Sequence, residues 1–474
     1  MTLERRSWWG GRSHITFTIV VFVALASLDN AAIALIPNMV LPVSAELGTS
    51  EGAIGAITAI VILITALTAV GWGYWGDRSS RKRLLLYGTA VWATGAALSA
   101  TSAGYWQLLL WQSVTAVGLG SIASVGFSVI SDFVRPARRG LAMSFWGLSQ
   151  GIGGLAGGLL ASQVGADDFR RPFVAIAVLG GLFGLLYLLT FDPPRGFREP
   201  ELETLRDTGE EYEHHIDRDQ IPLLFKTRTN RWLVLQGLSA QFAYGSLIWV
   251  PLLYQEKVVD AGYSIATGTK VGGIFVALFQ VGGLFSILAG HLGDKWQSRD
   301  PAGRAKISSI GILGAIPFFV GFFFVPLRGL EVNPNGSTLA LIGDVLESLV
   351  TNPWTAAAFL LALGAAAMTG ADSPNKLALI ADVNLPEHRG TVFGVADLAS
   401  GIGRSSGVGL TGLVAGTIER AIPPPLNWAV GLAAFQVFFL PTGYCYWRAI
   451  GTVPDDISRV RDILEERAGA ATGS

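Results

Sequence analysis

The chain has 474 residues, of which 51% are hydrophobic and only 15% are charged, whereas soluble globular proteins carry about a quarter charged residues. Its formal net charge of −1 gives no indication of a nucleic-acid partner. The single cysteine, Cys445, excludes an intramolecular disulfide, and no Cys or His spacing typical of a metal site occurs. We therefore expect an integral membrane protein without a metal ion or other cofactor.

Twelve apolar stretches are long enough to cross a bilayer as helices, which takes about 20 residues each. They predict an all-α membrane protein with twelve transmembrane helices in two pseudo-symmetric six-helix bundles, over 1–191 and 231–450. A polar cytoplasmic linker, 192–230, separates the bundles, and an amphipathic cytoplasmic tail covers 451–474. The expected spans are 15–42, 51–75, 84–102, 105–134, 140–164, 172–191, 231–255, 267–292, 306–327, 355–382, 390–418 and 426–448.

The positive charges predict the orientation of these spans. Most of the 34 Lys and Arg residues lie in segments that face the same side if the N-terminus is inside, as the positive-inside rule requires. The first apolar stretch is too long for a cleavable signal peptide, and no signal for an organelle occurs. We expect a multi-pass protein of the cell (inner) membrane, monomeric and surrounded by lipid, with both termini in the cytoplasm.

An internal repeat relates the two halves. Asp132-x-x-x-Pro136-x-x-Arg139 after the fourth span recurs with the same spacing after the tenth span, beginning at Asp382. Gly-Ile-Gly follows in the next span of each half, and the pattern Gly-x-x-Gly-Asp-Arg/Lys follows both the second and the eighth spans. Three matches in the same order predict two parallel copies of a six-helix unit.

The repeated acidic and basic residues lie at helix ends on the inner side. An acid at such a position can bridge to a neighbouring helix and hold the cytoplasmic side in one conformation. We therefore expect a conformational gate there. Its members are Gly73, Asp77, Arg78, Arg81, Asp132, Arg139, Asp294, Lys295, Asp382 and Arg389.

The segment after the second span resembles the best-known signature of the major facilitator superfamily, Gly-x-x-x-Asp-Arg-x-x-Arg-Lys. The resemblance covers about residues 15–450. It implies alternating access by a rocker-switch movement around a central cavity, without nucleotide hydrolysis. The matching residues are Gly73, Asp77, Arg78, Arg81 and Lys82.

The first four spans resemble the spinster-type branch of this superfamily, which is associated with lysophospholipids and sphingoid lipids. Two sites depart from that pattern. Asn30 stands where the branch has Arg after the Asp of the first span, and Gln112 and Leu119 stand where it has Arg and Glu in the fourth. The residues that carry the resemblance are Leu28, Asp29, Asn30, Leu41, Pro42, Gly76, Asp77, Arg78, Trp92, Gly118 and Gly120.

Charged residues within the spans are the main candidates for function, because a charge in the bilayer interior is costly. Asp29 lies in the first span, roughly 21 Å from its inner end. A buried carboxylate there could take up and release a proton, although a structural Asp paired to a neighbouring helix is the alternative. Asp372 and Asp397 are the other acids that we expect to take part in proton coupling.

Two acid–base pairs share helix faces in the second half. Asp372 and Lys376 are four residues apart, with Pro374 between them interrupting the helical hydrogen bonds. This arrangement could form a coupling or substrate site, or an internal pair that pins a kink. Asp397 and Arg404 are seven residues apart. Arg404 could bind an anionic head group or could neutralise Asp397.

Other polar side chains in the spans could hydrogen-bond a substrate, although packing is the alternative for each. The expected substrate-binding residues are Asn30, Gln150, Gln241, Tyr244, Lys376 and Arg404.

These features favour a proton-coupled secondary transporter of a small amphipathic organic molecule or lipid, for which a lysophospholipid is the leading candidate. A multidrug/proton antiporter is the alternative, since Gly147–Gly158 resembles the glycine-rich antiporter signature. A membrane enzyme is not expected, because the loops contain no catalytic triad, nucleotide-binding loop or metal set. The expected partners are the substrate, protons and membrane lipids, with no nucleic acid.

Overall fold

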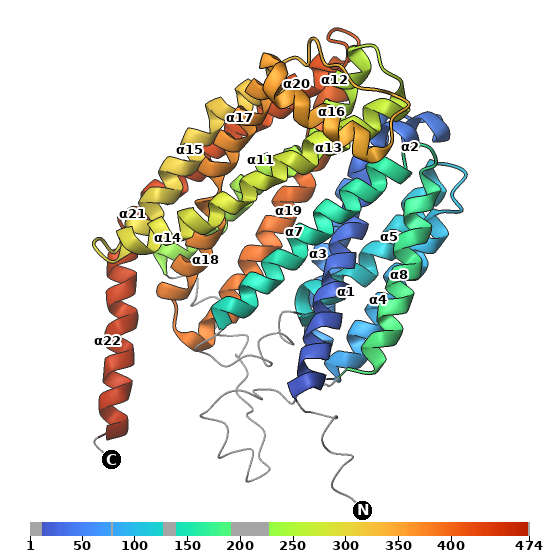
Figure 1. Ribbon diagram of the computed structural model, residues 1–474. Coiled ribbons are helices and arrows are strands. Elements are labelled where there is room, and N and C mark those ends of the chain that lie inside the picture. Colours follow the sequence, from blue (N-terminus) through green and yellow to red (C-terminus); the bar gives the residue numbers. More distant parts are fainter. Residues whose placement is uncertain (1–11, 77–78, 127–138, 191–226, 473–474) are drawn as a thin grey trace, which may run out of the picture. The chain divides into compact units, whose positions relative to one another are not determined.

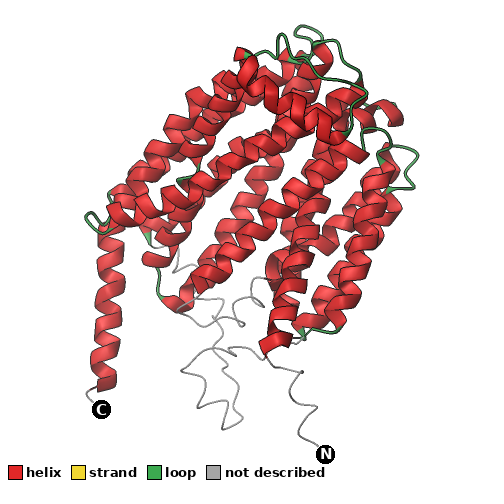
Figure 2. Ribbon diagram, viewed as in Figure 1, coloured by secondary structure: helices red, strands yellow, loops and turns green. Residues whose placement is uncertain are grey.

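The computed structural model describes residues 12–76, 79–126, 139–190 and 227–472. Within these ranges all regular elements are helices, and no strand occurs (Figure 2). The contacts between Cα atoms divide the chain into two compact units. Unit 1 comprises Met1–His214 and Ser264–Ala277, and unit 2 comprises His215–Tyr263 and Leu278–Ser474.

Unit 1 is a bundle of helices. Its elements are α1 (Arg12–Asn38), α2 (Val40–Leu47), α3 (Glu51–Gly76), α4 (Arg81–Ser99), α5 (Tyr105–Ser121), the π-helical turn η1 (Ile122–Gly126), α7 (Arg139–Val164), α8 (Arg170–Leu188) and most of α13 (Ile265–Phe279). Helix α1 packs along α7, whereas α4 packs against both α5 and α8 (Figure 1). The turn from α2 into α3 begins at Gly48, which adopts a left-handed conformation with φ +60°.

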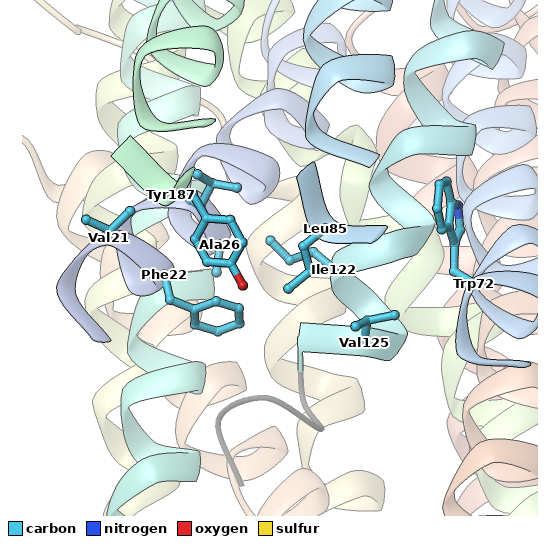
Figure 3. Packing of buried hydrophobic residues seen from close by; sticks show 9 residues of the cluster. Val21, Phe22, Ala26, Trp72, Leu85, Ile122, Val125 and Tyr187 are labelled. Carbon is cyan, nitrogen blue, oxygen red and sulfur yellow. The ribbon is translucent and has the colours of Figure 1, made fainter. Parts of the chain in front are cut away.

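An apolar core lies where α1, α3, α4, η1 and α8 meet in unit 1. Phe22 and Ala26 of α1 are buried with Tyr187 of α8, and Leu85 and Ile122 belong to the same cluster (Figure 3). These helices therefore bury apolar side chains against one another as well as presenting apolar surface outward. Burial of this kind fixes the neighbours of α1, the helix that carries Asp29.

Helix α13 is held to unit 1 through α7. The ammonium group of Lys270 lies 3.0 Å from each carboxylate oxygen of Asp167, and Gln163 Nε2 donates to the Lys270 carbonyl at 2.9 Å. Gly273 lies so close to Ser162 that a Cβ atom there would overlap the hydroxyl group. These contacts explain why Ser264–Ala277 groups with the first part of the chain.

Unit 2 contains the remaining helices, several of which are interrupted. Its elements are α11 (Arg228–Ser246), η5 (Leu247–Trp249), α12 (Val250–Asp260), η6 (Gln280–Leu284), α14 (Phe285–Gln297), α15 (Gly303–Phe324), α16 (Thr338–Thr351), α17 (Pro353–Thr369), α18 (Asp372–Asp382), α19 (Pro386–Ile418), α20 (Leu426–Phe435), η7 (Gln436–Phe438), α21 (Phe439–Ile450) and α22 (Val453–Thr472). Helix α11 packs along α19 and against α21, and α15 packs against α17 and α21.

The expected span 355–382 is broken into α17 and α18. The break lies just before Asp372, and Pro374 falls in the first turn of α18 rather than at the break itself. Proline is tolerated in a first helical turn, because the N–H group that it lacks has no partner within the helix there. The interruption places Asp372 at the N-terminus of α18.

Glycines bring α1 and α7 into close contact in unit 1. A Cβ atom at Gly153 would overlap the carbonyl oxygen of Ser27, and one at Gly157 would overlap the backbone of Ala31. Small residues four apart let helices in membranes approach closely. The contact runs along the part of α1 that carries Asp29.

The same kind of contact joins α11 and α19 in unit 2. A Cβ atom at Gly403 would overlap the carbonyl oxygen of Leu238, and one at Gly407 would overlap that of Phe242. The two glycines are again four residues apart. They hold the helix that carries Asp397 and Arg404 against α11.

Eight helical segments of the described residues are long and apolar enough to cross a membrane. They are Thr16–Asn38, Glu51–Gly76, Arg170–Leu188, Arg228–Asp260, Ile265–Gln297, Gly303–Phe324, Pro353–Asp382 and Leu426–Ile450. These segments make the chain a multi-pass α-helical membrane protein, as the sequence predicted.

Candidate functional site

Asp29 is a buried carboxylate in the middle of α1. Its side chain is 1% exposed, and within the described structure neither of its carboxylate oxygens has a hydrogen-bond partner. An ionised carboxylate buried without partners is strongly disfavoured. The alternative expectation, a structural Asp paired to a neighbouring helix, therefore has no contact among the described residues to support it.

A small apolar pocket lies between α1, α3 and α5, about one turn beyond Asp29. Gln112 and Leu119, the two neutral residues at positions where the spinster-type pattern has charges, both line it. Gln112 Nε2 donates to Ser99 Oγ at 2.9 Å. The lining residues are Ala32, Ile33, Ile36, Thr58, Val61, Ile62, Gln112 and Leu119.

The other polar candidates in unit 1 are not gathered around Asp29. Asn30 Nδ2 donates to the carbonyl oxygen of Ala26 in its own helix at 2.9 Å. Gln150 lies exposed on α7. Their predicted role in substrate binding stays a prediction.

Asp372, in contrast, is buried among hydrogen-bond donors in unit 2. Its Oδ1 atom accepts from Tyr446 Oη at 2.5 Å and from Gln236 Nε2 at 2.8 Å. Tyr244 also hydrogen-bonds this carboxylate. The donors come from α11 and α21, so the carboxylate ties α18 to both helices.

Lys376 lies one turn after Asp372 but does not form a close ion pair with it among the described residues. Its ammonium group donates to Ser400 Oγ at 3.4 Å. Electrostatic attraction links Lys376 with both Asp372 and Asp397. The predicted Asp372–Lys376 pair is thus part of a wider set of charges that includes α19.

Asp397 and Arg404 are both exposed on α19. Within the described part of the chain no ion pair joins them, and no hydrogen-bond partner of Arg404 is recorded. No contact between the two side chains therefore supports the expectation that Arg404 neutralises Asp397. Gln241 lies on α11 beside Gly403, partly exposed.

One arginine connects three helices at one end of unit 2. Arg304, in the first turn of α15, donates to Asp294 at the end of α14 with an Nη2–Oδ1 distance of 2.7 Å, and it also pairs with Asp382 at the end of α18. Its side chain is only 16% exposed, so water screens these pairs less than it would at an open surface. Lys295, which was expected in this gate, is exposed.

The equivalent end of unit 1 is described only in part. Asp77, Arg78 and Asp132 lie outside the described residues, and the side chains of Arg139 and Arg389 are likewise not described. The other two gate candidates are placed. Gly73 faces Ser124 across the α3–η1 contact, where an added Cβ atom would lie 3.5 Å from Ser124 Cβ. Arg81 is buried at the start of α4, where Ser80 caps the helix.

The loop between α14 and α15 carries a second ion pair beside Arg304. Lys306 hydrogen-bonds the Asp300 carboxylate, and the backbone N–H of Ala302 donates to it at 2.9 Å. These two hydrogen bonds lower the pKa of Asp300. Asp300 therefore stays ionised near neutral pH and fixes the loop that leads to Arg304.

The tail helix α22 contacts the beginning of α11. The backbone N–H of Thr229 donates to Asp456 Oδ2 at 3.1 Å, and Arg459 Nη2 donates to Thr227 Oγ1 at 2.8 Å. Asp456 thereby satisfies one of the free N–H groups at this helix end. Residues 192–226 of the expected linker, 192–230, lie outside the described residues.

Two residues of these sites were not among the sequence-based candidates. Tyr446 donates a hydrogen bond to Asp372, and Arg304 bridges the two acids of the gate. No pattern in the sequence indicates that a tyrosine in the last span faces an acid in the tenth. Arg304 had a detectable signal, because it belongs to the basic cluster that follows the repeated Asp294.

This chain combines membrane-spanning helices with acidic and basic residues that recur at helix ends, and it matches a known family. The model of the Major Facilitator Superfamily matches residues 18–408, most of the chain. The chain therefore belongs to the Major Facilitator Superfamily. It is a membrane transporter rather than an enzyme, and the predicted resemblance is confirmed.

Several of the similar proteins are of the spinster type. Protein spinster homolog 3 of Danio rerio is 25% identical over 354 residues, which are 71% of this chain and 68% of that protein. Sphingosine-1-phosphate transporter SPNS2 of Xenopus tropicalis is 27% identical over 271 residues, 54% of this chain and 50% of that protein. This chain thus matches about half the length of the latter.

Solved structures show the same fold. A bacterial homolog of the human lysosomal transporter Spinster, crystallised in an inward-facing and occupied conformation, has a TM-score of 0.71. The match covers 94% of this chain and 99% of that chain at 19% sequence identity. At this identity the likeness concerns the fold alone.

Proposed function

We propose that this protein is a proton-coupled transporter of an amphipathic lipid-like substrate. It would lie in the cell (inner) membrane with twelve spans in two six-helix halves and both termini in the cytoplasm. The spinster-type relatives support an amphipathic substrate, since one of them is named for sphingosine-1-phosphate transport. A lysophospholipid combines an acyl chain with a phosphate head and serves as the test substrate.

The proton role rests on one observation, the burial of Asp29 without a partner in the described structure. Such a group is stable when neutral and loses its proton when water reaches it. Alternating access supplies that change of environment. Asp372 differs, because Tyr446 and Gln236 donate hydrogen bonds to its carboxylate.

The helix pairings support two equivalent halves. In unit 1, α1 packs on α7 through Gly153 and Gly157, and in unit 2, α11 packs on α19 through Gly403 and Gly407. These glycines occupy matching positions in the sequence repeat. Contacts of α4 with α5 and α8 likewise correspond to contacts of α15 with α17 and α21.

The gate role of Arg304 follows from its two acidic partners. It ties the ends of α14 and α18 to the start of α15, so these three helices move together. Breaking such a charge-assisted bridge is one way in which a transporter half changes its packing. We assign the repeated residues of unit 1 the equivalent role.

The test is uptake of a labelled lysophospholipid into liposomes containing the pure protein, with and without an imposed pH gradient. We expect the gradient to stimulate uptake by the wild type. Asp29→Asn removes the titratable group while keeping the size of the side chain, so the stimulation should disappear. Glu347→Gln, at an exposed acid of α16, is the matched control and should behave as the wild type.

Two results would overturn the proposal. Uptake stimulated equally in Asp29→Asn and the wild type would remove Asp29 from proton coupling. Absence of lipid uptake, with exchange of a cationic dye against protons in the same vesicles, would establish the multidrug/proton antiporter instead. The spinster-type resemblance would then concern only the fold.

A further inference from the structure

Helix α19 exposes two different faces. Ile402, Leu410 and Leu413 are exposed apolar residues, with Leu413 62% accessible. Arg404 is also exposed but lies nine positions before Leu413, which is about two and a half helical turns and places it on the opposite side. Lipid suits the apolar face, whereas a charge facing lipid would be costly. The face with Arg404 is therefore the one that meets water or substrate.

Three polar residues follow this second face in order. Asp397 and Arg404 are exposed, and Ser400 lies between them with Lys376 Nζ 3.4 Å from its hydroxyl oxygen. The face thus presents the negative group of Asp397, then about one turn later the Ser400 hydroxyl with the Lys376 ammonium beside it, and about two turns after Asp397 the guanidinium of Arg404. The buried Asp372 does not compete for Arg404, because it is occupied by donors from α11 and α21.

We propose that this face of α19, with Lys376, binds a zwitterionic head group. The anionic part lies between Lys376, Ser400 and Arg404, and the ammonium part lies at Asp397. The inference rests on the proposed function, for which it names the head-group chemistry. It concerns residues of unit 2 only and is independent of which acid carries the proton.

The geometry favours a zwitterion over a simple anion or cation. Ser400 and Asp397 are three residues apart, about 5 Å along the helix axis, and an ammonium and a phosphate joined by two carbons are separated by a similar distance. A simple anion would satisfy Arg404 and leave Asp397 with Lys376 as its only electrostatic partner. A simple cation would leave Arg404 without a partner. Only a head with both charges gives each exposed group an opposite charge.

The experiment compares three probes with the same chain length by titration of tryptophan fluorescence in an uncharged detergent. Lysophosphatidylcholine carries both charges, lysophosphatidic acid only the anion, and an alkyltrimethylammonium only the cation. Arg404→Gln should weaken binding of the first two probes by about tenfold or more, the usual effect of losing a hydrogen bond to a charged group. Asp397→Asn should weaken the first and third probes.

The controls separate a local effect from misfolding. Arg404→Lys keeps the positive charge and should retain most of the binding of lysophosphatidic acid. Arg420→Gln makes the same change at an exposed arginine just beyond α19 and should leave all three affinities unchanged. Arg404→Gln should leave the affinity for the alkyltrimethylammonium unchanged, and Asp397→Asn should leave the affinity for lysophosphatidic acid unchanged.

The inference is overturned if Arg404→Gln and Asp397→Asn weaken the three probes equally, or weaken none of them. Its failure is distinct from failure of the proposed function. Proton-driven lipid uptake by a protein that binds all three probes alike would refute only the zwitterion site. Selective binding without any response to a pH gradient would refute only the proton coupling.

Discussion

Asp29 and Asp372 are two buried carboxylates that differ in their hydrogen bonding. Asp29 has no recorded partner in the described structure, whereas Asp372 accepts hydrogen bonds from Tyr446 and Gln236. Hydrogen bonds to a carboxylate hold the side chain in one position. Without them, the protonation of a buried carboxyl group depends on whether water reaches it. The proton-coupling role of Asp29, Asp372 and Asp397 stays a prediction, and the difference in hydrogen bonding makes Asp29 the first of the three to test.

Tyr446→Phe tests the structural role of Asp372. The substitution removes only the hydroxyl group that lies 2.5 Å from the carboxylate. We expect a loss of about 1.5–3 kcal/mol in stability, the range for a hydrogen bond to a charged group, read as a lower thermal unfolding midpoint of the pure protein. Tyr444→Phe on the same helix removes an exposed hydroxyl and serves as control. Equal midpoints for the two variants would refute the role.

Sequence reasoning identified the acids but not their partners. Asp29, Asp372 and Asp397 stand out because charges are rare in apolar spans. Tyr446 and Gln236 are ordinary polar residues of helices far apart in the sequence, so only the packing of α11, α18 and α21 brings them to Asp372. Which acid is partnered depends on three-dimensional contacts and could not follow from spacing along one helix.

At the scale of elements, glycine pairs decide which helices touch closely. Gly153 and Gly157 of α7 face the α1 backbone, and Gly403 and Gly407 of α19 face α11. The repeat made the correspondence of these spans visible in the sequence. It did not indicate which glycines of a glycine-rich helix lie at the contact. Gly154 lies between Gly153 and Gly157 in the sequence, yet it faces open space.

Gly157→Ala and Gly154→Ala make the same chemical change with opposite expected effects. A methyl group at Gly157 overlaps the Ala31 backbone, so α1 and α7 must move apart. At Gly154 a Cβ atom meets nothing within 4 Å, and alanine favours a helix over glycine by about 1 kcal/mol. We expect a lower unfolding midpoint for Gly157→Ala and an unchanged or higher one for Gly154→Ala. The reverse order would show that α1 and α7 are not in close contact there.

For the whole molecule, hydropathy and the internal repeat predicted a multi-pass helical membrane protein in two related halves, and the resemblance of the segment after the second span to the family signature predicted a transporter of this superfamily. Eight segments meet the criteria of length and apolarity within the described residues. Among the helices over the other predicted spans, α5 is shorter than the eight segments, α4 begins with three basic residues, and α19 carries Asp397 and Arg404 within its length. The side of the membrane on which each loop lies follows only from the distribution of Lys and Arg.

That orientation is testable with single cysteines. The native thiol of Cys445 is buried and is removed first by Cys445→Ala. In that background, Ser298→Cys in the loop before α15 should lie inside, and Asn335→Cys in the loop before α16 should lie outside; both positions are exposed. A membrane-impermeant maleimide added to intact spheroplasts should label only Asn335→Cys, and both variants should react once the membrane is opened. Labelling of Ser298→Cys alone in intact spheroplasts would invert the topology and place the Arg304 bridge on the outer side.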